Sequence, residues 1–308
     1  MSLLEWFKKV TLLMSSIQLH LDVRPGCQQR GQVFGHSNSI CPFEEGYIAK
    51  KATKNEIKFY QVYKEKLYKY FPENLLPEIL GIVEFEKPIG EYVAGEDVMI
   101  KNLRDLETIN LDEDMTGEYM VQKDIAAGFQ RPCILDLKIG VRTWRIGASK
   151  KKAARRREKN NRGPNHELKF RVRGGEWYSD NKEKWSHKEM LSYVGRDFSK
   201  YCTLEQLKEF LFDFFKHRNE LQFVINKLEE LEDGLKRLHE LGIRFYSSSV
   251  LVVYDEMNPE KVDCRMLDFE KSYLDVKSEA EKYGESLEEC EDGVVAAISN
   301  LKSLLKSI

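Results

Sequence analysis

The spacing of apolar and polar positions predicts two structural regions along the chain, and the first combines short strands with one long helix. Apolar or aromatic residues recur at helical spacing between residues 55 and 71, with Asn55 as the candidate cap and Pro72 as the stop. Short apolar runs typical of strands accompany this helix, at residues 46–50, 79–86 and 97–100. This region is therefore predicted to be a small α+β lobe.

The second region alternates strands with longer helices. An apolar run at residues 133–139 contains two charged positions, Asp136 and Lys138. Further helices are expected at residues 149–160, 204–215, 221–241 and 293–305, and further strands at 166–172, 250–254 and 262–267. Thr203 and Gln206 form a capping-box pattern before the second of these helices. We therefore expect an N-terminal extension, a first lobe, a hinge with an acidic insertion and a second lobe, at residues 1–30, 31–101, 102–123 and 124–308.

Composition narrows the classes of function that the chain could serve. Lys and Arg (49) nearly balance Asp and Glu (51), so any anion-binding site must be a local concentration of charge. Six cysteines lie far apart without a Cys-x-x-Cys pair, which argues against zinc and disulfides and favours a reducing compartment. No apolar run approaches the ~20 residues that a membrane span needs. We expect a cytoplasmic or nuclear protein without stable membrane insertion.

One motif stands out among the candidates for chemistry. The Walker pattern and the protein-kinase glycine-loop and H-R-D patterns are absent from the sequence. Residues 132–140, PCILDLKIG, match P-x-x-x-D-x-K-x-G, the signature of the inositol polyphosphate kinases. Other blocks resemble the same family in the same order, at residues 32–36 (QVFGH), 50–60 (Lys50, then E-x-x-F-Y from Glu56), 245–251 (FYSSSVL), 265–269 (RMLDF) and 292–293 (DG).

The resemblance implies a fold and a set of roles. The fold would be two-lobed α+β and related to protein kinases, with a small antiparallel-sheet first lobe, a larger mixed second lobe and ATP in the cleft. Lys50 would hold nucleotide phosphates with Glu56 as its ion-pair partner, and Asp136 would contact the ribose. Lys138 would lie between the γ-phosphate and the acceptor, and Asp268 would bind Mg²⁺ with Ser249 close by. A hinge at residues 99–103 would pair its backbone with adenine, and its candidates are Ile100, Asn102 and Leu103.

Each of these residues also has a simpler structural interpretation. Lys50 with Glu56 is the pattern of a surface ion pair, and the serines at 247–249 are typical of a turn. Asp136 could cap a structural element, although burying a carboxylate without a partner is costly. The family resemblance favours the functional interpretation of all of them.

A second candidate for anion binding follows the motif directly. The segment at 148–157 is strongly basic, and with the preceding G-x-R it resembles the inositol hexakisphosphate kinases within the family. A densely phosphorylated inositol needs such a cationic surface. The candidate substrate ligands are Lys138, Arg142, Lys150, Lys151, Lys152, Arg155 and Arg156, with Arg171, Arg173 and Arg196 as weaker ones. A solvated helix face or a nuclear localisation signal are the alternatives.

The resemblance implies an ATP- and Mg²⁺-dependent kinase acting as a monomer on a soluble inositol polyphosphate. We favour inositol hexakisphosphate as the acceptor, giving a diphosphoinositol. A multikinase that phosphorylates ring hydroxyls of tris- and tetrakisphosphates is the nearest alternative. A catalytically weakened binding module is another, because Lys101 and Glu270 depart from the family pattern. Nucleic-acid binding is disfavoured, since no aromatic residue interrupts the basic segment.

Overall fold

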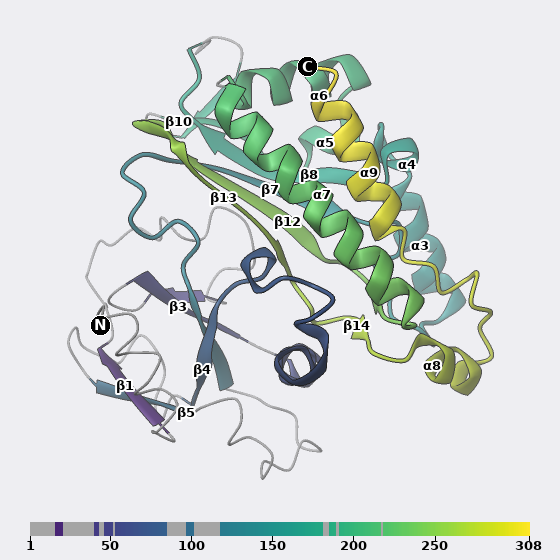
Figure 1. Ribbon diagram of the computed structural model, residues 1–308. Helices are drawn as coiled ribbons and strands as arrows, with labels where there is room; N and C mark the ends of the chain where they lie inside the picture. The colour runs from purple at the N-terminus through teal and green to yellow at the C-terminus, as the bar shows by residue number, and fades with distance from the viewer. Residues whose placement is uncertain are drawn as a thin grey trace. The chain divides into compact units, whose positions relative to one another are not determined.

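The computed structural model describes residues 16–20, 40–42, 46–51, 53–84, 97–101, 118–180, 185–188, 191–216 and 218–308. The chain divides into two compact units (Figure 1), and each is described by itself. The first comprises residues Met1–Gln61 and Pro77–Gly128, and the second comprises Val62–Leu76 and Phe129–Ile308. These bounds differ from the expected lobes, because residues 62–76 group with the second unit and the first unit extends to residue 128.

The first unit is built on an antiparallel sheet with the strand order β1-β5-β4-β6-β3-β2. Its strands are β1 (Ser16–His20), β2 (Ile40–Pro42), β3 (Tyr47–Lys51), β4 (Ile79–Glu84), β5 (Asp97–Lys101) and β6 (Glu118–Lys123). Helix α2 (Lys54–Val62) buries Ile57 and Phe59 almost completely. The strands predicted at 46–50, 79–86 and 97–100 are confirmed, while the block at 32–36 that resembles the family lies outside the described residues.

The helix predicted at residues 55–71 begins earlier and ends differently. Thr53, not Asn55, supplies the cap, since its Oγ1 accepts a hydrogen bond from the Glu56 backbone N–H at 3.3 Å. After Val62 the chain continues as a π-helical turn, η2 (Tyr63–Leu67), and then as a 3-10 turn, η3 (Glu73–Leu75). The Tyr63 hydroxyl donates to the Phe71 carbonyl at 2.7 Å and closes this segment.

The second unit contains the larger sheet, in the order β13-β12-β7-β8-β10-β9, with helices packed on one face (Figure 1). Its strands are β7 (Pro132–Ile139), β8 (Phe170–Trp177), β9 (Ser186–Lys188), β10 (Leu191–Val194), β12 (Ser249–Asp255) and β13 (Asn258–Leu267), with a separate pair, β11 (Arg244–Phe245) and β14 (Ser272–Tyr273). Its helices are α3 (Lys150–Asn160), α4 (Asn165–Leu168), α5 (Phe198–Tyr201), α6 (Leu204–Phe214), α7 (Arg218–Glu240), α8 (Val276–Tyr283) and α9 (Val294–Leu305).

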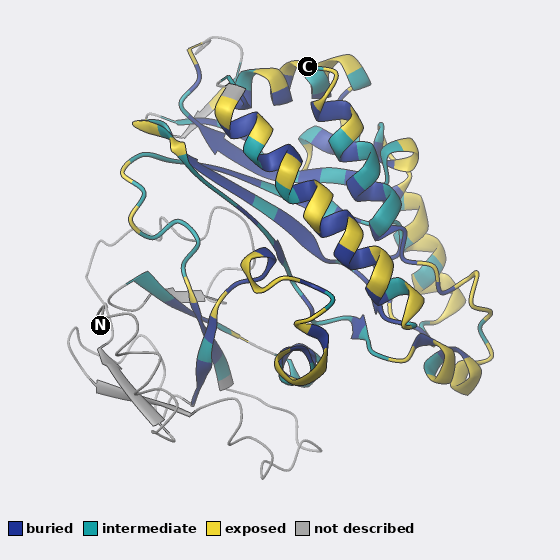
Figure 2. Cartoon of the chain, viewed as in Figure 1, coloured by how far each residue is buried: buried dark blue, intermediate teal, exposed yellow. Residues whose placement is uncertain are grey.

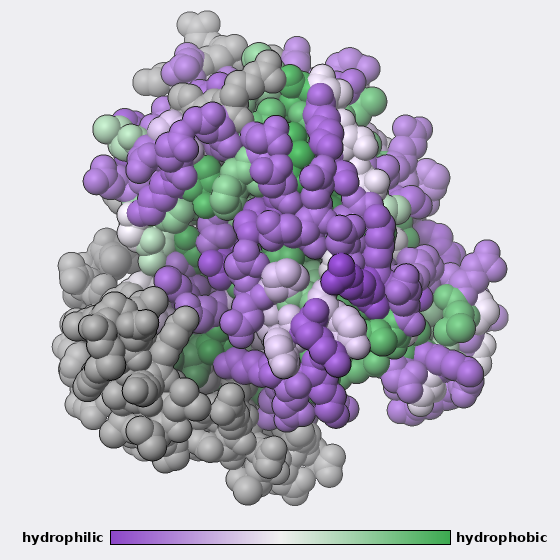
Figure 3. Space-filling view, in the orientation of Figure 1, coloured by the Kyte–Doolittle hydropathy of each residue, from purple (hydrophilic) through white to green (hydrophobic). Residues whose placement is uncertain are grey.

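Apolar side chains between this sheet and helices α6, α7 and α9 form the core of the second unit (Figure 2). Trp177 contacts Phe210 edge-to-face at 5.1 Å between ring centroids, and Phe214 contacts Tyr254 in the same way at 5.2 Å. The capping box of Thr203 and Gln206 is present at the start of α6, as its sequence predicts. Hydrophilic side chains cover most of the described surface seen in Figure 3.

The strand predicted at residues 166–172 is wrong in its first half. Residues 165–168 form the short helix α4, and Lys169 turns the chain into β8 with a φ of 59°. The Asn165 side chain explains the difference, since its Nδ2 donates to the carbonyls of Arg162 and Ser199. Within the described part of the chain, no helix is both long enough and apolar enough to cross a membrane.

Candidate functional site

Strand β7 presents the two charged residues of the motif on one face of the sheet. Asp136 and Lys138 are half-buried, whereas Leu135, Leu137 and Ile139 between and beside them are fully buried on the opposite face. This is the two-residue alternation of a strand with one face in the core. The apolar positions of the motif therefore anchor the strand, and the charged positions are left for chemistry.

The neighbouring strands add polar side chains to the same face. Lys138 lies directly opposite Ser249 of β12 and opposite Arg171 of β8. Directly opposed residues in an antiparallel pair share a face, so these three side chains gather around one point. The register of β7 and β8 shifts between Asp136 and Leu137, and this bulge contains Arg173 as the extra residue. We name this surface, with Asp136, Lys138, Ser249, Arg171 and Arg173, the reacting face.

The ionisable groups of the reacting face perturb one another. Burial raises the pKa of Asp136 to about 6, against the opposing effect of Lys138 and with a further increase from Asp268. Burial lowers the pKa of Lys138 to about 8, against the stabilising effect of Asp268 and Asp136. Burial and the cation of Arg173 lower the pKa of Arg171 to about 10. At neutral pH Lys138 is mostly a cation and Asp136 mostly an anion, so the face holds opposite charges close together.

Asp268 stands at the end of β13, immediately after the residue that pairs with Ser249. Its φ is 65°, a left-handed conformation that Asp tolerates better than most residues. The Ser248 hydroxyl donates to the Asp268 carbonyl at 2.9 Å and holds this turn. The carboxylate lies close enough to the motif to affect the pKa of both Asp136 and Lys138. The structure thus brings together the predicted residues Asp136, Lys138, Ser249 and Asp268.

Two oxygen atoms of this group lack hydrogen-bond partners. Asp136 Oδ1 and Ser249 Oγ are both buried without a hydrogen bond of normal geometry, although Ser249 lies close enough to the Asp136 carboxyl to lower its pKa. Buried polar atoms are normally satisfied, so such orphans mark a place where a ligand completes the site. Carboxylate and hydroxyl oxygens are the donors that Mg²⁺ prefers, and nucleotide hydroxyls would also satisfy them. The residues present therefore fit a nucleotide and a divalent cation.

The motif ends on Gly140, where the backbone conformation and the available space exclude a residue with a side chain. Gly140 has a φ of 85°, and a Cβ there would lie 2.6 Å from the Asp292 carbonyl. That carbonyl accepts a hydrogen bond from the Val141 N–H at 2.8 Å. The Asp292 carboxylate accepts from the backbone of Phe245 at 2.7 Å and of Val294 at 3.0 Å. The terminal D-G block thus ties the end of β7 to β11 and α9.

Helix α3 carries the basic segment, and its cations differ in exposure. Ser149 caps the helix by accepting from the Lys152 N–H at 3.3 Å. Four predicted substrate ligands are exposed, namely Lys150, Lys151, Lys152 and Arg155. Arg156 is half-buried, and its Nε is buried without a partner. At the end of the helix, Asn160 joins α3 to the reacting face, because its Oδ1 accepts from Arg171 Nη1 at 2.8 Å and its Nδ2 donates to the Val141 carbonyl at 2.8 Å.

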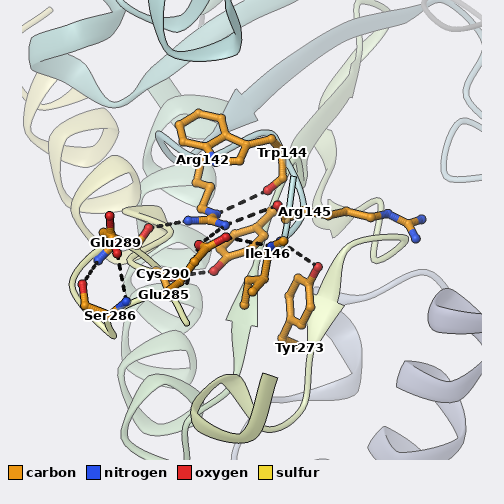
Figure 4. A network of polar contacts seen from close by, with 11 residues as sticks. Arg142, Trp144, Arg145, Ile146, Tyr273, Glu285, Ser286, Glu289 and Cys290 are labelled. Carbon is orange, nitrogen blue, oxygen red and sulfur yellow. Dashed lines mark hydrogen bonds and ion pairs between the residues drawn. The ribbon is translucent and has the colours of Figure 1, made fainter. Parts of the chain in front are cut away.

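Arg142 was expected to bind substrate, and the structure buries it instead (Figure 4). Its Nη2 forms an ion pair with Glu285 at 2.7 Å, its Nη1 donates to the Glu289 carbonyl, and its Nε donates to the Trp144 carbonyl. The guanidinium also lies over the Tyr246 ring at 4.9 Å. With its donors used inside the protein, Arg142 fixes the turn that leads to α3, and we leave it out of the proposed substrate ligands.

Lys50 and Glu56 belong to the first unit and form an ion pair of 3.0 Å between β3 and α2. The Glu56 side chain is only 3% exposed, so the pair is not the solvated surface pair of the simpler interpretation. Lys51 beside it is exposed. Ile100 lies within β5, where its backbone is paired with β1 and β4. The other hinge candidates, Asn102 and Leu103, lie outside the described residues, as does most of the acidic insertion.

The structure also adds residues that the motifs do not contain. Arg171 and Arg173, ranked as weaker candidates from the sequence, lie on the reacting face, and their R-x-R alternation is the signal that a strand presents both. Lys271 is not among the residues predicted from the sequence. Burial lowers the pKa of its ammonium group, and Asp268 lies close enough to influence that pKa. Glu270, which departs from the family pattern, forms an ion pair of 3.1 Å with Arg145. Arg145 therefore balances the negative charge of Glu270.

Several known proteins resemble this chain in sequence or in fold. A family model described as inositol polyphosphate kinase matches residues 119–306. "Inositol hexakisphosphate kinase 3" of Mus musculus is 28% identical over 213 residues, which cover 64% of this chain and 52% of that protein. "Inositol hexakisphosphate kinase 2" of Homo sapiens is 33% identical over 151 residues, covering 47% and 34%. The chain thus matches about half or less of the length of these relatives.

A solved structure shares the fold. The inositol phosphate multikinase Ipk2 of S. cerevisiae, in complex with ADP and Mn²⁺, superimposes with a TM-score of 0.58 at 15% identity. The match covers 85% of this chain and 98% of that one. At this identity the likeness concerns the α+β architecture and its antiparallel sheets, which are those predicted from the sequence.

Proposed function

Because the chain belongs to the inositol polyphosphate kinase family of ATP-dependent phosphotransferases, we propose that it transfers the γ-phosphoryl group of ATP to a densely phosphorylated inositol. The observation that carries the proposal is the reacting face itself. Asp136 and Lys138 come from β7, Asp268 follows β13 directly, and the three side chains influence one another electrostatically beside the buried Ser249 hydroxyl. Phosphoryl transfer needs this combination of a cation, acidic ligands and fixed geometry, and little covalent help from the protein.

The roles follow from charge and position. Asp268, with Ser249 beside it, would hold Mg²⁺, which supplies neutralisation of phosphate charge when bound. Lys138, mostly protonated at neutral pH, would neutralise the phosphoryl group during transfer. Asp136, mostly ionised, would accept hydrogen bonds from the ribose hydroxyls. Lys50, held by Glu56 in the first unit, would contact the nucleotide phosphates, and the hinge would pair with adenine through Asn102 and Leu103.

We favour inositol hexakisphosphate as the acceptor, so that the product is a diphosphoinositol. The support is the number of cations around the site, since Lys138, Arg171 and Arg173 gather on the reacting face and α3 adds its exposed lysines and arginines. An acceptor phosphate is already ionised at neutral pH, so its attacking oxygen needs no general base. Accordingly, none of the described groups on the reacting face is placed as an obvious base for a ring hydroxyl, since Asp136 and Asp268 are assigned to the nucleotide and the metal.

A turnover assay with ATP and Mg²⁺ against inositol tris- to hexakisphosphates, with products separated by charge, tests the proposal. A product more acidic than inositol hexakisphosphate is expected, and it should disappear in Asp268→Asn. Turnover restricted to the tris- and tetrakisphosphates would replace this proposal with a multikinase acting on ring hydroxyls. Folded protein that binds ATP and gives no product with any acceptor would favour the binding module.

A further inference from the structure

A basic hollow of about 290 Å³ opens beside helix α3 in the second unit. It is lined by five cations and one carboxylate, namely Arg155, Arg156, Glu158, Lys159, Arg162 and Lys200. Most of these residues recur at helical spacing along α3 and just past its end, while Lys200 comes from α5. Cations near a helix C-terminus are favoured by the helix dipole, but this effect does not account for Lys200 on a separate helix.

The positive charge of this hollow is only partly balanced. Arg162 pairs with Glu158 at 3.2 Å, and Lys200 pairs with Asp197, but both carboxylates are about 70% exposed (72% and 70%). Such exposed pairs contribute little. Arg155, Arg156 and Lys159 have no ion pair within the described part of the chain. Like charges held together without counter-charges repel one another, and a polyanion would relieve that repulsion.

Two details of the hollow favour an anion as its ligand. The Arg156 Nε is buried and donates no hydrogen bond. Burial and the neighbouring cations Arg171, Arg156 and Lys200 lower the pKa of Lys159, so its ammonium is held where the protein itself disfavours positive charge. A bound phosphate would accept a hydrogen bond from Arg156 and would balance the positive charge of Lys159.

The hollow adjoins the reacting face on the side away from Asp268. Along the sheet, the order runs from β13 and β12 through β7 to β8. Arg171 on β8 bonds Asn160 of α3, and the Val172 N–H donates to Ser199 of α5 at 2.7 Å. Both helices that line the hollow are therefore fixed to β8, one strand beyond Lys138. Cations follow one another from Lys138 through Arg171 to Arg156 and Lys159.

We propose that this hollow is a distal phosphate subsite of the acceptor, in which Arg162 and Lys200 join Lys159 in binding phosphates remote from the one that reacts. The inference rests on the proposed function and extends it, because it assigns the preference for many phosphates to residues outside the motifs. Acceptors with few phosphates would occupy the reacting face and leave the hollow unfilled. The subsite would thus set how strongly the protein discriminates between hexakis- and trisphosphates.

The first experiment measures equilibrium binding of inositol hexakisphosphate and of an inositol trisphosphate to the full chain, without ATP, by calorimetry. Arg162→Ala/Lys200→Ala should weaken hexakisphosphate binding by about tenfold, since two charge-assisted contacts are lost, and should affect the trisphosphate less. Arg237→Ala/Lys277→Ala removes the same charge from exposed positions on α7 and α8 and serves as the control. Equal losses in both double variants, or none in the first, would overturn the subsite.

A second variant changes affinity in the opposite direction. Glu158→Gln removes the one carboxylate of the hollow and should tighten hexakisphosphate binding by about twofold, a gain that misfolding does not produce. Unchanged or weaker binding would count against the subsite. Because these are binding measurements, they separate the two proposals: a protein without turnover that shows these shifts keeps the subsite and loses the kinase proposal. Normal turnover without these changes in affinity would keep the kinase proposal and overturn the subsite.

Discussion

Strand β7 and helix α3 both present charged side chains in the second unit, and the fold treats those charges in different ways. On β7, Asp136 and Lys138 are surrounded by buried residues, and their pKa values move toward neutrality. On α3, Lys150, Lys151 and Lys152 project into solvent. A few desolvated charges interact strongly, so substituting one of them has a large effect. Many solvated charges interact weakly, so substituting one of them has a small effect. This difference predicts that β7 and its neighbours determine the rate of reaction and that α3 determines affinity.

Asp268→Asn, next to the reacting face, should produce the largest effect of the predicted variants. We expect turnover to fall by about 10³-fold or more, because a carboxylate ligand of the cation is lost. Asn tolerates the left-handed φ of 65°, so the fold should survive. Glu270→Gln, two residues away and paired with Arg145, is the matched control and should keep turnover within a few-fold. Near-normal turnover in folded Asp268→Asn would remove Asp268 from the site.

The sequence predicts the reacting strand well and its surroundings less well, for a physical reason. Asp136, Lys138 and Asp268 lie within short apolar runs, where local alternation and a family motif both identify them. The environment of Arg142 depends on Glu285, which is 143 residues further along the chain, so local pattern could not show that its donors are used. The convergence of Lys200 with α3 is equally non-local. The first half of the strand predicted at 166–172 was wrong because the Asn165 side chain donates a hydrogen bond to the Ser199 carbonyl, which is 34 residues further along the chain.

Arg142→Leu tests a cation that lies close to the basic segment of α3 in the sequence but is buried like the charged residues of β7. Removing one partner of a buried pair leaves Glu285 without its cation, so we expect the free energy of unfolding to fall by about 3 kcal/mol. Denaturant unfolding measures it, with Arg145→Ala, an exposed pair, as a control that should cost about 0.5 kcal/mol. Unchanged stability with a raised KM would return Arg142 to the substrate ligands.

Asp136→Asn tests whether burial on the reacting face costs stability. The folded pKa of about 6 lies above the unfolded value of 3.8, so the folded state favours the protonated acid. Stability from this group is therefore present at low pH and is lost as pH rises from about 4 to about 6. Relative to the wild type, the variant should gain roughly 2 kcal/mol in unfolding free energy between pH 4 and pH 7.5. A difference that does not change with pH would contradict the raised pKa.

Asp197→Asn should change the free energy of unfolding with pH in the direction opposite to Asp136→Asn. The hydrogen bond from Lys200 lowers the pKa of the exposed Asp197 carboxyl, so its small contribution is present at neutral pH and lost in acid. The wild type should therefore gain stability over this variant as pH rises. If both variants followed the same direction, the contrast between buried and exposed charge would not hold.

The comparison between β7 and α3 can be tested most directly on α3. Arg155→Ala/Arg156→Ala/Arg157→Ala keeps helix propensity and removes three cations, so KM for inositol hexakisphosphate should rise by about tenfold with kcat little changed. Arg237→Ala/Lys277→Ala/Lys282→Ala removes the same charge from α7 and α8 and should leave KM near the wild-type value. An unchanged KM in the first variant would make the basic segment a solvated face. A fall in kcat as large as that of Asp268→Asn would instead place α3 within the reacting machinery, because affinity alone cannot lower the rate at saturation.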